Sequence, residues 1–404
     1  MISLCLRRAE AVPLTAKITV SDIKGDKDFL EALLPHATRI SDLSLTGFPS
    51  IEGVADDLPG FFASPIPNLT SLELEQAEEP TESFPSNETP APPLFLSVSK
   101  LKSLYLTRTP LYPALCNIRS LVELKLVGYT TPFGFGKFIG FLRSNSDLEL
   151  IILDVQFVEV RASLERFPST VTSFPRLRQL SLTCVNEIDA KGLISLISFP
   201  SGVLLEVFGS QEDQYNDIRL FLPFPKIREL LTPITTIKCQ SSPSREIHLS
   251  GNNSLFSFRS ANDQFNPGPE FSLFNTTMVR EFHAKVNPHR AVLFEPLSRF
   301  PALETLILLG VTSFPHVSLG FLAEKPVLCP SLKTIAFVDC VLSSRVIEEL
   351  GEVVARRKNS TAAWLHRVVI VRRDGKLPDY GLIHRLRQFV PRVDVGISEL
   401  PDLP

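Results

Sequence analysis

One short pattern recurs through this chain and limits the folds that it can adopt. A segment of the form L-x-x-L-x-L begins two residues after a proline. Aliphatic residues occupy all or most of its first, fourth and sixth positions. Counted from the residue before the proline, the copies begin at Ile66, Phe174, Phe224, Phe300 and Cys329. Repetition at intervals of tens of residues is typical of chains whose units stack side by side, each packing only on its neighbours. Such a chain offers a long binding face rather than one central core.

Further units appear when any aliphatic or aromatic residue is allowed at these positions. The alternation at the end of each unit predicts a short strand, because successive side chains of a strand point to opposite faces. The preceding proline is expected to end the returning helix, since it donates no N–H and disfavours helix in the residue before it. The fourth positions of the predicted units are 43, 72, 104, 124, 151, 180, 205, 230, 247, 282, 306, 335 and 368. Their uneven spacing predicts parallel strands joined by returns of variable length.

Helical periodicity accounts for several of the returns. Helices are predicted over 26–34, 190–197, 344–357 and 380–389, and an apolar segment at 393–397 follows the last one. Two segments fall outside the repeat pattern: 73–93 is an acidic exposed loop, and 250–275 is a turn-rich insert with phenylalanine anchors. The repeat array therefore covers 36–398. Residues 1–35 are either a strand and helix that cap the array or a remnant linker, and 399–404 form a tail.

Composition excludes several classes of protein. Hydrophobic residues make up 44% of the chain and charged residues 21%, which describes an ordered protein. The net charge of −3 provides no global field toward nucleic acid or membrane, and no stretch approaches the roughly 18 apolar residues of a membrane span. The six cysteines are dispersed, and the first residues do not resemble a secretory signal. We expect reduced cysteines and a cytoplasmic or nuclear location.

Motifs for catalysis or cofactor binding are missing from the sequence. The glycines from Gly134 to Gly140 differ in spacing from a phosphate-binding loop, and a helix start beside a turn is the simpler interpretation. His283 and His289 are not accompanied by cysteines or carboxylates in the order of metal ligands. The basic stretches near Arg356 and Arg372 contain few of the aromatic residues that stack on bases. We therefore expect no enzyme, no cofactor, no metal, and neither nucleic acid nor membrane as a partner.

The strand positions that alternate with the aliphatic residues are the candidates for binding a protein. They should project from the concave face of the sheet, polar on the early strands and apolar on the later ones. The predicted contact residues are Tyr105, Glu123, Lys125, Ile152, Ile307, Leu309 and Val338. An apolar run across adjacent strands marks an interaction patch if it is exposed. The other interpretation is that the insert 250–275 or the tail covers the patch, and the exposure of Ile307 and Val338 distinguishes the two.

Two features of the chain, a cysteine-containing repeat and the N-terminal stretch, resemble a known family. The segment from Leu177 to Leu193 looks like the cysteine-containing leucine-rich repeat L-x-x-L-x-L-x-x-C-x-x-I-T-D-x-G-L, although Val185 stands where cysteine is expected. In the unit that begins at Leu332, Cys340 falls on the cysteine position. Residues 4–20 look like the L-x-R-S-x-x-x-P-L stretch that joins the F-box region to the first repeat in basidiomycete proteins. The chain thus resembles the repeat portion of fungal F-box proteins with irregular leucine-rich repeats, while the L-P-x-E opening of an F-box is not found.

This resemblance implies both a fold and a function. The expected fold is an α/β, irregular leucine-rich-repeat solenoid (horseshoe) with a parallel concave sheet and a mixed helical and irregular convex side. The expected function is non-enzymatic binding of a protein on the concave face, as in the substrate-recognition part of an SCF-type ubiquitin ligase receptor. A ligase adaptor would bind only if an F-box precedes this sequence. The alternative is a free-standing leucine-rich-repeat scaffold or inhibitor-like protein without a ubiquitin link.

Overall fold

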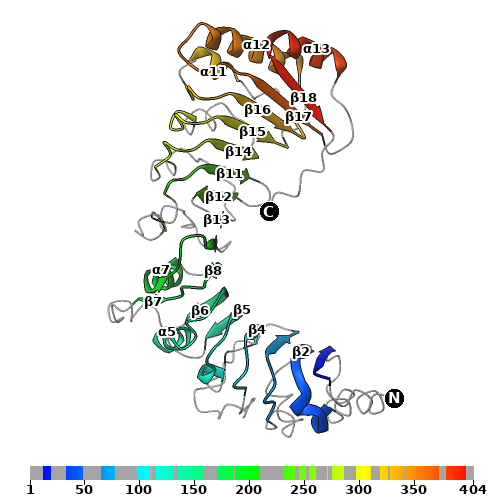
Figure 1. Cartoon of the computed structure of the whole chain (residues 1–404), viewed down its shortest axis with the longest axis vertical. Helices are drawn as coiled ribbons and strands as arrows, with labels where there is room; N and C mark the ends of the chain where they lie inside the picture. Colours follow the sequence, from blue (N-terminus) through cyan, green and yellow to red (C-terminus); the bar gives the residue numbers. More distant parts are fainter. Residues whose placement is uncertain are drawn as a thin grey trace. The chain divides into compact units, whose positions relative to one another are not determined.

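A computed structural model divides the chain into two compact units, Met1–Asp213 and Gln214–Pro404 (Figure 1). Each unit is described by itself. The structure describes residues 12–19, 33–48, 65–77, 98–109, 111, 115–131, 135–157, 171–184, 187–209, 227, 229, 232–241, 245–251, 254–260, 271, 275–285, 297–310, 319–325, 328–340, 342–372 and 379–396.

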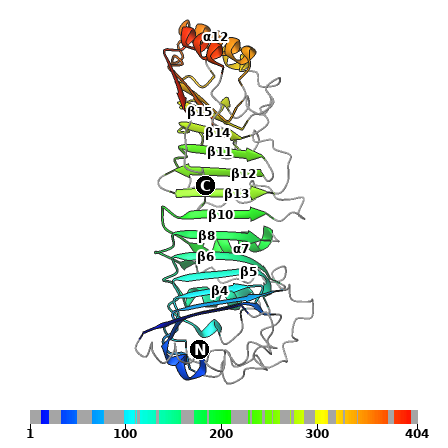
Figure 2. The ribbon, with the colours of Figure 1, turned by 90° about the vertical axis from the view of Figure 1, so that its right-hand side faces the viewer.

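The first unit is built on a parallel sheet. Its strands pair in the order β1-β2-β3-β4-β5-β6-β8-β10, and Figure 2 shows them lying side by side. A short parallel pair, β7 and β9, forms a separate sheet. The strands are β1 (Leu14–Thr19), β2 (Ile40–Phe48), β3 (Ser71–Gln76), β4 (Ser103–Thr107), β5 (Glu123–Thr131), β6 (Leu150–Phe157), β7 (Thr172–Ser173), β8 (Gln179–Cys184), β9 (Ile197–Ser198) and β10 (Leu204–Gly209).

Two rows of aliphatic side chains form the core beneath this sheet. The strand register places the fourth and sixth positions of successive units opposite one another, and all of them are buried. One row contains Leu43, Leu72, Leu104, Leu124, Ile151, Leu180 and Leu205, and the other contains Leu45, Leu74, Leu106, Leu126, Leu153, Leu182 and Val207. Each repeat therefore completes its core only by stacking on the next repeat.

The recurring proline lies in a tight turn that leads into the strand. In four copies the residue before proline accepts a backbone hydrogen bond from the leucine three positions later, and the bonds measure 2.9–3.2 Å. Proline favours the second position of such a turn because its fixed φ suits that geometry. Both ends of the turn are buried, so it anchors the strand in the core. The four turns are Ile66–Leu69, Phe174–Leu177, Phe300–Leu303 and Cys329–Leu332.

Helices return the chain between strands of the first unit. They are η1 (Leu34–Arg39), η2 (Leu115–Asn117), α5 (Phe135–Arg143) and α7 (Glu187–Leu196). Helix α5 buries Phe135, Phe138, Ile139, Phe141 and Leu142. It contains Gly136 and Gly140, two of the glycines that were compared with a phosphate-binding loop. The predicted helix over 190–197 is confirmed by α7, although Ile197 belongs to β9. The predicted helix over 26–34 lies outside the described residues except at Leu33 and Leu34.

The sheet of the second unit mixes two directions. Strands β11, β14, β15, β16, β17 and β18 are parallel in that order, while β12 is antiparallel to both β11 and β13. The buried row Ile237, Phe282, Leu306, Ile335 and Val368 continues the pattern of the first unit. The strands are β11 (Thr236–Ser241), β12 (Arg245–Gly251), β13 (Ser254–Ser260), β14 (Glu281–Lys285), β15 (Thr305–Leu309), β16 (Thr334–Val338), β17 (Arg367–Val371) and β18 (Arg392–Gly396).

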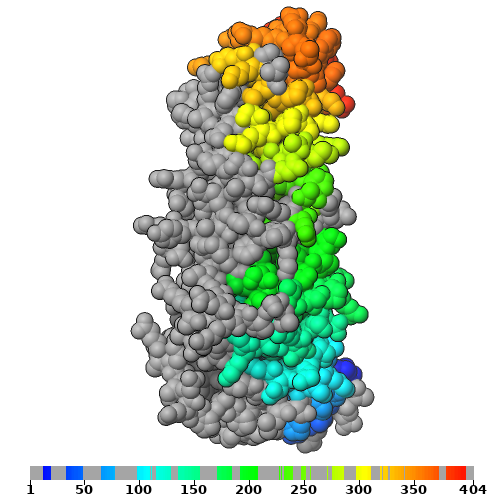
Figure 3. Space-filling view, turned by 90° about the vertical axis from the view of Figure 1, so that its left-hand side faces the viewer, coloured from blue at the N-terminus to red at the C-terminus, as the bar shows by residue number. Residues whose placement is uncertain are grey.

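Helices α11 (Gly320–Glu324), α12 (Ser344–Lys358) and α13 (Tyr380–Phe389) lie together beside the last strands of this unit (Figure 1). The predictions over 344–357 and 380–389 are confirmed. Helix α12 begins where the side chain of Ser343 accepts the N–H of Val346, and it buries Val346, Ile347, Leu350 and Val353. Figure 3 shows the side chains of this region, in orange, as a continuous surface. None of the described helices combines the length and the apolar character needed to cross a membrane.

Four sequence predictions need correction. The unit predicted at Ile227–Leu230 is wrong, because Ile227 and Glu229 are helical and the strand is β11, after Pro233. The unit at 247–249 is a strand, but it runs antiparallel. The insert 250–275 is not turn-rich throughout, since Ser254–Ser260 forms β13; residues 261–270 lie outside the described part. The acidic loop does not begin at residue 73, because Glu73 and Glu75 belong to β3, and 78–93 lie outside the described residues.

The described part of the chain is an α/β protein with long parallel sheets of regularly spaced strands, an arrangement compatible with a leucine-rich-repeat-like solenoid. Within the predicted cap or linker at 1–35, the structure describes strand β1 and Leu33 to Pro35. The tail at 399–404 lies outside the described residues.

Candidate functional site

Each sheet has a second face, opposite its aliphatic rows, which we call the outward face. On the first unit, strand register aligns its side chains in two rows that are mostly half-exposed. One row contains Asp42, Ser71, Ser103, Glu123, Leu150 and Gln179, and the other contains Ser44, Glu73, Tyr105, Lys125, Ile152, Ser181 and Glu206. Tyr105, Lys125 and Ile152 are thus direct neighbours on β4, β5 and β6.

Tyr105 and Glu123 form the centre of a hydrogen-bonded group on this face. The hydroxyl of Tyr105 donates to Glu123 Oε2, and Ser103 Oγ donates to the same oxygen at 3.0 Å. Burial, together with the neighbouring Glu123 carboxylate, raises the pKa of Tyr105 to about 12. The hydrogen bond to Glu123 orients the ring and hydroxyl of Tyr105 on this face.

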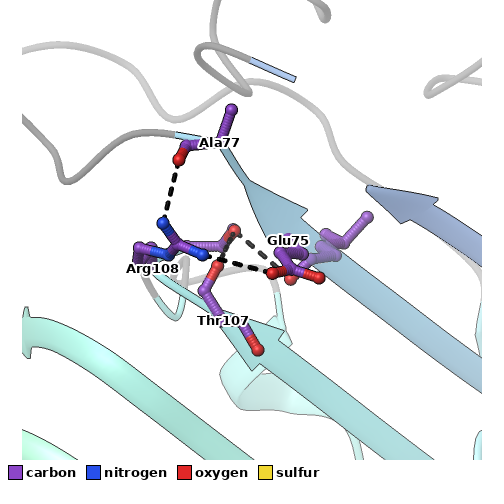
Figure 4. A network of polar contacts seen from close by, with 6 residues as sticks. Glu75, Ala77, Thr107 and Arg108 are labelled. Carbon is purple, nitrogen blue, oxygen red and sulfur yellow. Dashed lines mark hydrogen bonds and ion pairs between the residues drawn. The ribbon is translucent and has the colours of Figure 1, made fainter. Parts of the chain in front are cut away.

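Arg108 holds the ends of three neighbouring strands together at the margin of this face. It follows β4 with φ of 53°, and its guanidinium donates to Ala77 O at 2.8 Å and to Glu75 Oε1 at 3.2 Å (Figure 4). The backbone N–H of Arg108 donates to Val127 O at 2.7 Å. The contacts link the segments that follow β3 and β4 to β5, so Arg108 is a structural residue here.

The outward face of the second unit has an apolar centre. Ile307 and Leu309 on β15 and Val369 on β17 are half-exposed, with β16 between them. Val338 on β16 is only 4% exposed and Val371 on β17 only 7%. Val338, one of the predicted contact residues, is therefore buried, whereas Ile307 and Leu309 remain accessible. The patch is neither fully open nor fully covered.

Charged side chains border this apolar centre on both sides. On β14, His283 is buried and its Nε2 hydrogen-bonds Glu281 Oε1, a contact that lowers the pKa of Glu281. His283 Nδ1 is buried and has no hydrogen-bond partner in the described part of the chain. On β18, Asp394 accepts from Arg367 Nε at 2.6 Å and from Arg392 Nε at 3.0 Å, and these bonds lower its pKa.

Two lysines beside His283 were missed by the sequence interpretation. Lys238 lies opposite His283 on β11, and Lys285 is the last residue of β14. Lys238 was missed because β11 itself was not predicted. Lys285 was overlooked because only the first half of its strand matched the repeat pattern, although the alternation Glu281-Phe-His-Ala-Lys285 was visible.

The described residues contain no obvious catalytic or metal-binding constellation. No group of three or more His, Cys, Asp or Glu side chains among them is placed to hold a metal ion. Burial raises the pKa of Cys116 to about 11 and that of Cys329 to about 12, so neither thiol is a nucleophile near neutral pH. What the outward faces offer is hydrogen bonding, ion pairing and apolar contact.

The predicted contact residues therefore fall into two groups, one on each unit. Tyr105, Glu123, Lys125 and Ile152 are brought together on the first unit, and Ile307 and Leu309 lie on the second. Comparison with models of protein families and with curated proteins finds no match to this chain.

Proposed function

We propose that this chain is a non-enzymatic protein-binding solenoid of leucine-rich-repeat type, in which the outward face of a unit, the predicted concave side of its strands, binds a protein partner. The observation that carries the proposal is the in-register alignment of half-exposed side chains across adjacent parallel strands. Neighbouring strands lie about 4.8 Å apart, so these rows offer a closely spaced grid of contacts. The rows combine hydrogen-bonding, charged and apolar side chains, which together suit the recognition of a protein surface.

The resemblance to cysteine-containing repeats extends the proposal to the substrate-recognition part of an SCF-type ubiquitin ligase receptor. Cys340 supports this extension, because it occupies the cysteine position of its repeat and is buried. Its Sγ lies 3.2 Å from Leu308 O in the preceding repeat. The alternative is a free-standing scaffold or inhibitor-like protein without a ubiquitin link. Co-purification of the complete gene product with the ligase adaptor separates the two.

Partner capture tests the shared part of both proposals. A photo-crosslinking phenylalanine analogue in place of Tyr105 is expected to cross-link the partner, because this half-exposed side chain lies on the outward face of the first unit. Binding of the identified partner is then measured for a face variant that combines Glu123→Lys, Lys125→Glu, Ile307→Asp and Leu309→Asp. We expect affinity to fall at least tenfold.

A matched control places the same kind of charge change elsewhere. Lys137→Glu on α5 and Glu352→Lys on α12 alter exposed helical positions away from both outward faces. This variant should bind like the unmodified chain. Unchanged affinity of the folded face variant, or an equal loss in the control, would contradict the proposal.

A further inference from the structure

The outward faces of the two units differ in charge. In the strands of the first unit, the carboxylates Asp42, Glu73, Glu75, Glu123, Asp154 and Glu206 outnumber Lys17 and Lys125. In β11 and β14–β18 of the second unit, the cations Lys238, Lys285, Arg367 and Arg392 outnumber Glu281 and Asp394. The second unit is therefore the basic one, and its charge flanks an apolar centre.

The cations of the second unit are not equally satisfied. Asp394 is shared by Arg367 and Arg392, so the positive charge at β18 is partly neutralised within the chain. Glu281 is engaged by His283. Lys238 acts on the Glu281 carboxylate without forming an ion pair, and the side chains of Lys238 and Lys285 form no hydrogen bond or ion pair within the described residues. In the described part of the chain, two ammonium groups beside the apolar centre are thus not neutralised by a direct ion pair.

We propose that the outward face of the second unit binds an extended segment of a partner protein that carries aliphatic side chains followed by carboxylates. Ile307, Leu309 and Val369 would contact the aliphatic side chains, and Lys238 and Lys285 would pair with the carboxylates. This inference rests on the proposed function, since it specifies what one part of the binding surface recognises. Charge complementarity identifies the occupant, because a basic segment would place its cations beside these two lysines.

Strand spacing fixes the size of the segment. From Lys238 on β11 to Val369 on β17 there are four strand spacings, through β14, β15 and β16. At about 4.8 Å each, the span is roughly 19 Å, which about six residues of extended chain cover at 3.3 Å per residue. The aliphatic part should lie toward β17 and the acidic part toward β11.

Selection from a library of displayed random octapeptides tests the inference even while the natural partner is unidentified. The bait is the full chain, and a parallel selection uses the Lys238→Glu, Lys285→Glu variant. We expect the unmodified chain to enrich peptides with aliphatic residues followed by Asp or Glu, and the variant to lose this enrichment. Enrichment of basic peptides, or of purely apolar peptides without acidic residues, would overturn the inference, as would failure to enrich any peptide.

Affinities of the selected peptides then locate the contacts. By fluorescence anisotropy, Lys238→Glu and Ile307→Asp are each expected to weaken binding about tenfold or more. The matched controls Lys137→Glu and Val171→Asp change exposed residues of the same kinds outside the outward faces and should alter it less than about twofold. A second pair, Lys125→Glu and Ile152→Asp, tests whether the outward face of the first unit binds the peptides instead. Raising the salt concentration should also weaken binding, because exposed ion pairs are screened.

The outcomes separate this inference from the proposed function. If binding depends on Lys125 and Ile152 and not on Lys238 and Ile307, an outward face binds protein but the assignment to the second unit is wrong. If neither set of substitutions affects the selected peptides, both the inference and the proposed function lose their support.

Discussion

A single asparagine shows how the returns of the first unit are held in place. Asn145 follows helix α5 and is 1% exposed. Its Oδ1 accepts the N–H of Leu121 at 3.0 Å, and its Nδ2 donates to Ile118 O at 3.1 Å and Phe141 O at 2.9 Å. A buried amide with all these bonds satisfied links α5 to the chain that enters β5.

Replacing Asn145 with aspartate should therefore destabilise the first unit. The carboxylate can still accept from Leu121, but it cannot donate to the two carbonyls and it introduces a buried charge. We expect the free energy of unfolding to fall by about 2–4 kcal/mol. The same substitution at exposed Asn117 should change it by less than about 0.5 kcal/mol. Chemical denaturation followed by circular dichroism checks this, and equal effects at both sites would refute the role of Asn145.

Helix α12 is fixed to the sheet of the second unit by one buried cation. Arg357 is 0% exposed, and its guanidinium donates to Ala363 O and Cys329 O at 3.0 Å and to Leu328 O at 3.1 Å. Burial lowers the pKa of this guanidinium, so the carbonyls stabilise a charge that desolvation disfavours. The element therefore depends on a polar cluster as well as on its apolar stripe.

Substitution of Arg357 with leucine should loosen this element. The apolar volume is partly retained, but the carbonyls lose their donors, and each buried acceptor left without a donor costs about 1–3 kcal/mol. Trp364, the single tryptophan, lies just after Ala363 and reports the local transition by fluorescence. Arg356→Leu changes the exposed neighbour and serves as the control. If the midpoint of urea unfolding is the same in both variants, Arg357 does not have the proposed stabilising role.

At the scale of the whole molecule, the chain forms two compact units. In a repeat array each repeat is stabilised by its own contacts and by those with its immediate neighbours, so local stability need not be uniform. Within each compact unit the buried rows run from one strand to its neighbour. A defect in one unit should therefore leave distant strands of the other protected.

Crossed hydrogen-exchange measurements test this locality. Arg357→Leu is expected to accelerate amide exchange in β16 and β17 and to leave Leu104 and Leu124 of the first unit unchanged. Asn145→Asp should accelerate exchange in β5 and leave Ile335 and Val368 unchanged. Uniform acceleration throughout the chain in either variant would show that the molecule unfolds as one cooperative body.

The local pattern of aliphatic residues was sufficient to predict most of the strands. The aliphatic alternation around Leu104, Leu180 and Leu306 predicted strands that the structure contains, because a period of two requires only that one face be buried. The long amphipathic helix α12 was equally clear, since its buried positions recur at helical spacing. The polar positions Tyr105, Glu123 and Lys125 followed from the same alternation.

Tertiary packing decided what local pattern could not. Ile227 and Leu230 are three positions apart, which suits a helix as well as a repeat strand, and Ile227 proved helical. The direction of β12 depends on its partners β11 and β13 and not on its own residues. Alternation placed Val338 on the outward face, but its burial depends on what packs over it. A single sequence records which face each side chain takes; accessibility and pairing direction arise from residues distant in the chain, whose positions only the folded structure fixes.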